Sequence, residues 1–422
     1  MDPGPRYDLA MRIRLFAVFL LTLAITVVAC GRTESTVTTG AAADPVSLLV
    51  VSRADASIFT IKPDGSGRTD LVEERSGLVA VQPTWSPDGA RLVWTEVDHR
   101  SEVPEAFIAT SGPDGEELER VPASVAPFYY SWSPTGDQVA FLAPGPGGRV
   151  DLGLLQGGVR ILDGAQPYYF AWAPDGRTLL THTNLDTVAL LTTDGTLTTL
   201  IKTEARFQAP QWATDGTRLV FAIGSPPATG GVRTGAFQTS GQEIVVTDTG
   251  GSILHEIGPF AGVTTFELSP DGQQIAHSAT VDRNTFNFGP LFVTDLESGD
   301  EKTVTTEPVL AYQWSPTGDA LLYLAADGGT DLPTFRWAIW DGATSTSYGS
   351  VTPTPSFATS YLPFWDQYSR SHRMWAPDGS AFTYSGLTET GEPAVWVQAI
   401  EGDPEPSQVA SGDLVFWSPD SG

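Results

Sequence analysis

The chain has 422 residues, of which 41% are hydrophobic, with 43 glycines, 32 prolines and a formal net charge of −27 at pH 7. This composition is typical of many short strands separated by turns, and the sequence offers no long helical pattern. The negative charge argues against nucleic acid as a partner, and it either favours cationic partners or serves solubility alone. The single cysteine, Cys30, excludes a disulfide-rich scaffold.

The amino-terminal 30 residues predict an export signal. Arg12 and Arg14 form a basic start, and an apolar run from Leu15 to Ala29 follows and ends at Cys30. The run is shorter than the roughly 20 residues that a membrane-spanning helix needs. It resembles a bacterial lipoprotein signal with its lipobox, which implies that Cys30 carries lipid. An uncleaved membrane anchor with an incidental cysteine is the alternative.

Residues 31–44 contain mainly Thr, Ser, Ala and Gly without an apolar period, so they predict a flexible tether. The chain is therefore expected to divide into a signal peptide (1–29), a lipidated cysteine with its tether (30–45) and one folded domain (46–422). Met11 is an alternative start to Met1. We expect an exported protein that is lipid-anchored to the bacterial cell membrane or envelope, in a compartment such as the periplasm, and that touches the membrane only through its anchor.

Strands are expected directly after the tether. Val46 to Ser52, Ser57 to Ile61 and Arg68 to Glu73 have the composition of the second, third and fourth strands of a four-stranded unit. The first strand of this unit is expected at the other end of the chain, from Asp413 to Trp417. Pairing between the two ends would cover otherwise exposed edges and close a ring.

The other units share a motif whose first copy is Trp85-Ser-Pro-Asp-Gly89. In this motif proline presets φ for a type I turn, aspartate bonds nearby backbone, and glycine takes the positive φ that ends the turn. The turn therefore predicts a β-hairpin and needs no catalytic or calcium-binding explanation. Repetition of such a unit is typical of propeller blades or solenoids. The copies begin at Trp85, Trp132, Trp172, Trp212, Leu268, Trp314, Trp375 and Trp417.

The motif resembles the TolB-type, WD40-like (PD40) β-propeller repeat, and the match covers nearly everything from Val46 to the end. The resemblance implies an all-β fold that consists of a single closed β-propeller with eight four-stranded blades. The Gly-His and Trp-Asp dipeptides of true WD40 repeats are missing. TolB also carries a separate amino-terminal α/β domain that is not visible in this sequence. The motif departs from the repeat at Thr135, Thr214, Leu268, Thr317 and Ser421.

The later units contain insertions, and the longest is rich in aromatic residues. The connections that carry the insertions emerge on one face of a blade, opposite the Pro-Asp-Gly turns, and binding residues commonly lie on such loops. The insertions are Gly224–Gln242, Val281–Gly289, Ala326–Pro333 and Tyr348–His372. An exposed aromatic anchor in the last one is a candidate partner-binding site, formed by Tyr361, Phe364, Trp365 and Tyr368. The alternative is that these residues form a cap over the channel or a neighbouring blade.

The sequence contains no Gly-x-Ser-x-Gly, no His-Glu-x-x-His, no phosphate-binding glycine loop and no cysteine cluster. His182 and His277 are considered as a metal pair, but packing is the simpler interpretation because His277 takes the place of Trp94. Asp327 to Asp331 has oxygen ligands for calcium, yet it lacks the alternation of a calcium loop and is interpreted as a turn. We therefore expect no catalytic residue, no metal site and no cofactor.

Two functions are compatible with these features. The first is a non-catalytic lipoprotein at the cell envelope that binds a protein or peptide, as the resemblance to TolB implies. The second is a propeller enzyme, a hydrolase or lyase, in which carboxylates at the channel mouth act as acids, bases or metal ligands. An exposed aromatic patch would favour the first, and a cluster of inward carboxylates or bound calcium would favour the second.

Overall fold

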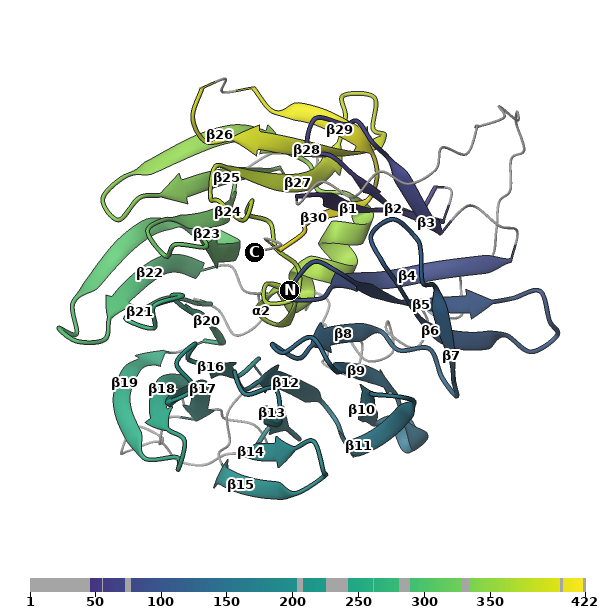
Figure 1. Ribbon diagram of the computed structural model, residues 1–422. Helices are drawn as coiled ribbons and strands as arrows, with labels where there is room; N and C mark the ends of the chain where they lie inside the picture. Colours follow the sequence, from purple (N-terminus) through teal and green to yellow (C-terminus); the bar gives the residue numbers. More distant parts are fainter. Residues whose placement is uncertain are drawn as a thin grey trace, which may run out of the picture. The chain divides into compact units, whose positions relative to one another are not determined.

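The computed structural model describes residues 46–419, with gaps at 55, 73–76, 203–207, 225–241, 261, 281–288, 328–333 and 403–404. The described residues all belong to one compact unit, which contains the elements below. The described residues are built from antiparallel strands with a few short helical turns (Figure 1). The expected all-β fold class is confirmed for this part of the chain.

Five sheets contain four strands each, and in four of them the strands follow one another in chain order. The five sheets are β30 (Leu414–Trp417), β1 (Leu48–Ser52), β2 (Ser57–Ile61) and β3 (Thr69–Val72); β4 (Leu78–Trp85), β5 (Leu92–Asp98), β6 (Glu105–Ser111) and β7 (Glu119–Ala123); β8 (Tyr129–Trp132), β9 (Val139–Pro144), β10 (Val150–Leu155) and β11 (Val159–Ala165); β12 (Tyr168–Trp172), β13 (Thr178–Thr183), β14 (Thr187–Thr192) and β15 (Leu197–Lys202); and β16 (Gln211–Trp212), β17 (Arg218–Gly224), β18 (Gln242–Asp248) and β19 (Ile253–Phe260). A short 3₁₀ turn, η1 (Pro146–Gly148), joins β9 to β10.

The sixth sheet has seven strands because two four-stranded groups share one long strand. Its strands are β20 (Thr264–Leu268), β21 (Gln274–Ala279), β22 (Gly289–Asp295), β23 (Glu301–Trp314), β24 (Leu321–Ala326), β25 (Phe335–Trp340) and β26 (Ser345–Val351). The first part of β23, Glu301–Thr305, pairs with β22, and its second part, Ala311–Trp314, pairs with β24. The fourth strand of one group thus continues directly into the first strand of the next.

The seventh sheet consists of β27 (Ala381–Leu387), β28 (Pro393–Ala399) and β29 (Ser407–Ser411). Residues 373–375 take the place of its first strand, because Trp375 forms a bridge with Phe382 and the Thr383 amide donates to the Met374 carbonyl at 2.8 Å. We call the strand that ends at the first residue of each motif copy an inner strand. The inner strands are β30, β4, β8, β12, β16, β20, the second part of β23, and residues 373–375.

The two ends of the described chain pair as expected. β30 is antiparallel to β1, with Leu48 opposite Trp417 and Val51 opposite Leu414. The Ser418 amide donates to the Ser47 carbonyl at 2.8 Å, which is the geometry of the Ser86 to Arg91 bond in the first motif copy. The carboxyl-terminal strand therefore completes the amino-terminal sheet, and its pairing with β1 is confirmed.

The motif turns have the predicted conformation. Gly89 has φ 68°, and the glycines of the six other described turns of the same kind have φ between 66° and 78°. The Asp88 carboxylate accepts hydrogen bonds from the Ser86 hydroxyl at 2.6 Å and from the Ala90 amide at 3.0 Å. The Ser86 hydroxyl is the main cause of the lowered pKa of Asp88. The Ser-Pro-Asp-Gly turns are thus explained by their own local bonding.

Two of the motif tryptophans, Trp172 and Trp375, connect neighbouring sheets. The Trp172 indole donates to the Ser131 carbonyl at 3.0 Å, so an inner strand is bonded to the one before it. Trp375 makes the same bond to Gln313 at 3.0 Å. Leu268 has no such donor, and its inner strand is the one that departs from the motif at the first position.

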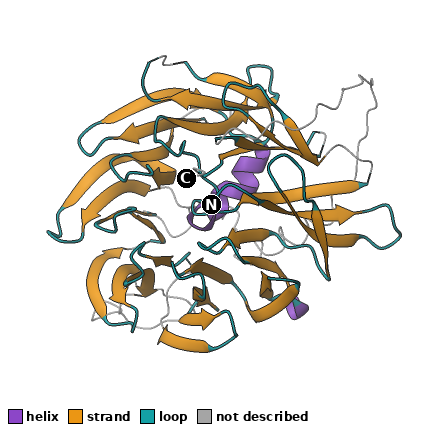
Figure 2. Ribbon diagram, in the orientation of Figure 1, coloured by secondary structure: helices purple, strands orange, loops and turns teal. Residues whose placement is uncertain are grey.

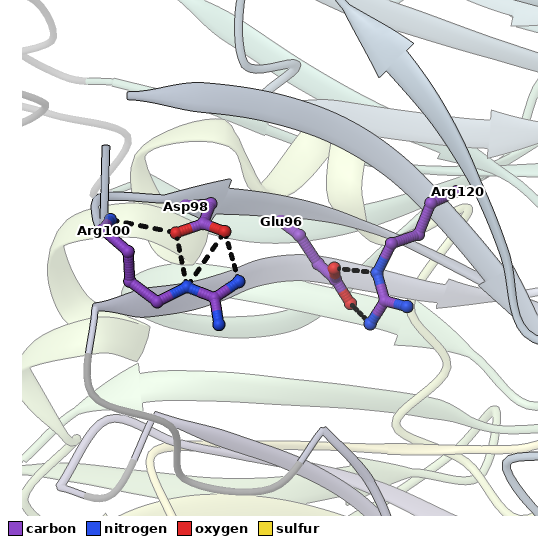
Figure 3. A network of polar contacts seen from close by, with 4 residues as sticks. All are labelled: Glu96, Asp98, Arg100 and Arg120. Carbon is purple, nitrogen blue, oxygen red and sulfur yellow. Dashed lines mark hydrogen bonds and ion pairs between the residues drawn. The ribbon is translucent and has the colours of Figure 1, made fainter. Parts of the chain in front are cut away.

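A buried ion pair fixes the outer strand of the second sheet (Figure 3). Glu96 on β5 is 1% exposed and accepts from Arg120 on β7 and from the Trp94 indole, each at 3.1 Å. The Asp98–Arg100 pair beside it lies at the surface. An exposed ion pair contributes little to stability, whereas a buried carboxylate without its partner destabilises the fold. The Glu96–Arg120 pair is therefore the one that orients β7.

Candidate functional site

The residues between the sixth and seventh sheets fold into the centre of the unit. This central segment, residues 352–372, contains the π-helical turn η2 (Phe357–Tyr361), the 3₁₀ turn η3 (Leu362–Phe364) and the single helical turn α2 (Trp365–Tyr368). It has no glycine, and prolines at 353 and 355 precede its first turn. Figure 2 shows it among the inner strands.

The central segment bonds to the inner strands of the early sheets. The Tyr368 hydroxyl donates to the Gln82 side chain of β4 at 2.9 Å. The Gln367 amide donates to the Phe170 carbonyl of β12 at 3.0 Å, and the Gln367 carbonyl accepts from the Tyr129 hydroxyl of β8 at 3.1 Å. One helical turn thus connects three different sheets.

It also bonds to the inner strands of the late sheets. The Gln313 side chain of β23 donates to the Ser369 carbonyl at 2.6 Å and accepts from the Met374 amide at 3.0 Å. The Tyr361 ring stacks on Phe416 of β30, with ring centroids 5.4 Å apart. The described inner strands are therefore held around a common structural centre.

The four aromatic candidates do not form an exposed anchor. Tyr361 is 2% exposed, Trp365 3% and Tyr368 6%, and Phe364 is partly buried. The Tyr361 hydroxyl donates to the His372 carbonyl at 3.1 Å. The expectation of an exposed aromatic patch is therefore wrong for these side chains, because the inner strands offer an apolar interior that covers them. The cap alternative agrees with the structure.

Three charged side chains meet beside this segment. Two of them, Asp366 and Arg370, bond to the backbone just before β16. The Asp366 carboxylate accepts a hydrogen bond from the Ala209 amide at 2.9 Å. The Arg370 guanidinium donates a hydrogen bond to the Pro210 carbonyl at 2.7 Å. Glu267 lies on β20 and is close enough to Arg370 for each to affect the other's pKa. All three keep part of their surface in contact with solvent.

Burial shifts the pKa of each of these groups. It raises the pKa of Glu267 to about 8, while the charge of Arg370 acts in the opposite direction. It also raises the pKa of Asp366, and it lowers the pKa of Arg370 to about 10. At neutral pH the Glu267 carboxyl is therefore mainly protonated. Groups with such shifts are candidates for functional sites.

The two histidines considered as a metal pair are packed in separate sheets. His182 Nδ1 lies 3.0 Å from the Gln208 carbonyl, and His277 Nε2 lies 2.9 Å from the Thr294 hydroxyl. Burial lowers the pKa of each to about 4. Among the described residues there is no group of three or more His, Cys, Asp or Glu side chains that would hold a metal ion. Packing explains both histidines.

Several predicted features lie outside the described residues. They are Cys30, the signal peptide and the tether, most of the insertions at 224–242, 281–289 and 326–333, and all of the stretch Asp327–Asp331 except its first residue. Asp327 pairs with Arg336 at 3.3 Å. Within residues 46–419, as far as they are described, no helix has the length and apolar character to span a membrane.

Hollows are present on the surface of the described residues, and two of them have the following linings. One, of about 450 Å³, lies beside β11 and is lined mainly by apolar residues, including Val125, Phe141, Val159 and Ile161. We call it the outer groove. The other, of about 210 Å³, lies between β19 and β22 and is lined by His255, Glu256 and Asp295 among others. The outer groove has the more apolar lining of the two.

No protein-family model and no curated protein sequence matches the chain. The solved structures that resemble it include the dihydro-heme d1 dehydrogenase NirN, with a TM-score of 0.58 and 15% identity, covering 90% of this chain and 76% of that one. A eukaryotic initiation factor has a TM-score of 0.53 and 12% identity, covering 89% of this chain and 98% of that one. A putative TolB from Agrobacterium tumefaciens has a TM-score of 0.37 and 19% identity, covering 61% of this chain and 87% of that one.

Sequence identities of 12–19% show a similar fold and nothing about function. With the repeated four-stranded sheets, the resemblances define the chain as a β-propeller. The similarity to TolB is too low to carry an argument, so membership of the PD40 group stays a prediction from the motif. One of these neighbours is a dehydrogenase and another is an initiation factor, so the fold does not decide the function.

The charged group was missed at the sequence level. Glu267 stands next to Leu268, the one motif copy without tryptophan, and this departure could have drawn attention to it. Asp366 and Arg370 have the i, i+4 spacing of a helical pair, but the segment was interpreted through its aromatic residues alone. The contact between them and β20 joins residues about 100 positions apart, which no local pattern reveals.

Proposed function

We propose that the protein is a non-catalytic propeller scaffold that binds a protein or peptide at the cell envelope. The observation that carries this proposal is that the chain's own central segment occupies the place between the inner strands. A large partner then binds on the outer surface of the blades. The overall negative charge favours a cationic partner.

The outer groove is the surface that we assign to this partner. Among the described strands β11 is an edge strand, because it pairs with β10 on one side only, and Val159 and Ile161 on it are 37% and 45% exposed. An exposed edge pairs with an extended peptide through its backbone, and a neighbouring groove takes alternate side chains. The partner is thus an extended segment in which apolar and basic residues alternate.

This proposal predicts binding of an immobilised synthetic peptide in which lysine alternates with valine or leucine. Full-length protein is expected to bind it saturably, and V159N/I161N is expected to weaken binding about tenfold or more, because two polar side chains replace apolar ones in the groove without a change of charge. L197N/I253N is the matched control, since Leu197 and Ile253 are comparably exposed on other outer strands. Surface plasmon resonance measures all three. Equal binding by both variants would move the partner site away from the groove.

We further propose that Cys30 carries lipid and becomes the mature amino terminus. This proposal is supported by the order of residue types in residues 12–30, which begin with basic residues, continue with an apolar run and end with small residues before the cysteine. Cys30→Ser is expected to release the protein from the membrane fraction or to leave an unprocessed precursor. Mass spectrometry of the exported protein checks this, and an unmodified Cys30 at an uncleaved chain would contradict it.

The closed ring of eight blades belongs to the same proposal. The supporting observations are the division of the long sheet at β23, the completion of the seventh sheet by residues 373–375, and the pairing of β30 with β1. With these, eight motif copies correspond to eight four-stranded groups. A closed ring gives a rigid scaffold whose inner edges are covered.

An enzyme remains the second candidate, because Glu267 and Asp366 are two carboxyl groups with raised pKa at the centre of the propeller. A carboxyl group whose pKa is about 8, as for Glu267, serves as a general acid near neutral pH. The hypothesis requires a small substrate that reaches Glu267 beside the central segment. Ligand binding at that position is therefore its first test.

A further inference from the structure

Glu267 is the only charged residue at its position in the repeat. The residue directly before the first motif residue is uncharged in every other copy: Thr84, Ser131, Ala171, Gln211, Gln313, Met374 and Phe416. At this position Thr84 donates to the Ser371 carbonyl at 2.8 Å, and Gln313 donates to Ser369. The position therefore faces the central segment, and Glu267 brings a carboxyl group to the side where Arg370 lies.

Two buried polar atoms at this place lack partners. Among the residues that the structure describes, neither Oε2 of Glu267 nor Nη2 of Arg370 has a hydrogen-bond partner, although both atoms are inaccessible. No ion pair joins Arg370 to Asp366 or to Glu267 in the described part of the chain, and Arg370 uses Nη1 for the Pro210 carbonyl. Leaving such groups unsatisfied costs about 1–3 kcal/mol each, so a ligand or water is needed.

Both atoms are donors at neutral pH. The guanidinium has only N–H groups. The pKa of Glu267 is raised to about 8 by burial, so its carboxyl keeps a proton and presents an O–H. Asp366 is already engaged as an acceptor by the Ala209 amide. Two donors without acceptors, one of them positively charged, match an anion with two oxygen atoms.

We propose that Arg370 and Glu267 bind the carboxylate group of a small organic acid at the centre of the propeller. A carboxylate accepts from a guanidinium and a neighbouring hydroxyl with its two oxygens, and its single charge offsets that of Arg370. Phosphate and dicarboxylates carry a second negative charge, which the single charge of Arg370 does not offset, so the site favours a monocarboxylate. The site is independent of the outer groove, and it supplies the small-molecule position that the enzyme hypothesis requires.

The pH dependence follows from the groups that face Glu267. Arg370, Asp366 and Tyr361 of the central segment and Tyr312 of β23 surround it. Burial raises the pKa of both tyrosines well above 10, and the pKa of Arg370 is about 10, so none of these three changes between pH 6.5 and 9. Ionisation of Glu267 removes its donor, so affinity falls as pH rises through about 8, by roughly tenfold at pH 9.

Titration calorimetry of the full-length protein with acetate tests the site. We expect saturable binding at pH 6.5 that weakens about tenfold at pH 9, and no binding of the neutral isostere acetamide. E267Q keeps a donor in the amide, so it should bind acetate without the pH dependence, which also separates Glu267 from Asp366. R370Q should abolish binding, and R373Q is the matched control because Arg373 is an exposed guanidinium on the same stretch of chain.

Three results would overturn the proposal. They are absence of saturable acetate binding by folded wild-type protein, equal affinity for phosphate, and an unchanged pH dependence in E267Q. In the first case the unpartnered atoms are satisfied by ordered water only. Because E267Q conserves size and shape, it keeps the test decisive even if R370Q does not fold. Failure of acetate binding leaves the peptide-binding proposal standing, since that proposal depends on the outer groove.

Discussion

Tyr361→Ala is expected to lower the free energy of unfolding by about 3–5 kcal/mol, which is a large fraction of the stability of a typical domain. Tyr361 is 2% exposed, and its ring lies within 6 Å of the rings of Phe357, Trp365, Tyr368 and Phe416. Truncation leaves a cavity that these rings cannot fill without moving the inner strands. Urea denaturation followed by tryptophan fluorescence measures the change.

Tyr361→Phe is the control for this experiment. It keeps the ring and removes only the hydrogen bond to the His372 carbonyl, so a loss of about 1 kcal/mol is expected. A Tyr361→Ala variant with unchanged unfolding midpoint would show that the central segment does not pack between the inner strands in solution. That result would restore the exposed aromatic anchor as a candidate partner site.

The strands could be predicted because their signals are local. Each Ser-Pro-Asp-Gly turn contains its own hydrogen bonds and its own positive φ, as at Ser86 to Gly89, so the hairpins follow from a few adjacent residues. The pairing of β30 with β1 could be predicted for a different reason. A four-stranded unit that lacks its first strand, and a single strand left at the other end, complete each other.

The position of the central segment in the fold could not be predicted from such local signals. An exposed interface anchor and a buried apolar cap can both be rich in aromatic residues such as Tyr361, Trp365 and Tyr368. Only the residues that surround the segment in the fold distinguish the two. The surroundings come from Tyr129, Gln313 and Phe416, in sheets far apart in the sequence. The same holds for the Glu267 and Arg370 pair, which exists only because the segment lies beside β20.

The long strand β23 contains a proline. Pro308 lies between Thr305, which pairs with β22, and Ala311, which pairs with β24, and proline removes a ladder hydrogen bond. In the structure Glu301–Trp314 runs through both groups, with a register shift between Val309 and Ala311. The irregularity falls beside the proline, so the chain passes from one sheet to the next without a loop.

Removal of residues 413–422 is expected to unfold or aggregate the domain. The deletion takes away β30 and with it Val415, Phe416 and Trp417, each about 3% exposed. Burial of three such side chains contributes about 1.5–3 kcal/mol each, and the loss of their sum approaches the stability of a whole domain. It also leaves β1 as an unpaired edge, which promotes association. Size-exclusion chromatography and a thermal melt measure both effects.

Moving the same residues to the other end should restore the fold. If Gly422 is joined to Ser47, so that the chain begins at Asp413 and ends at Gly412, Leu48 follows Trp417 by seven positions, as Leu92 follows Trp85. The Ser418 amide already donates to the Ser47 carbonyl at 2.8 Å, as Ser86 does to Arg91 in a continuous motif. The permuted chain therefore needs no new backbone geometry, and we expect a monomer with a melting temperature close to that of the wild type. If the truncated chain melts like the wild type, or if the permuted chain aggregates as the truncated one does, β30 is not the strand that completes the amino-terminal sheet.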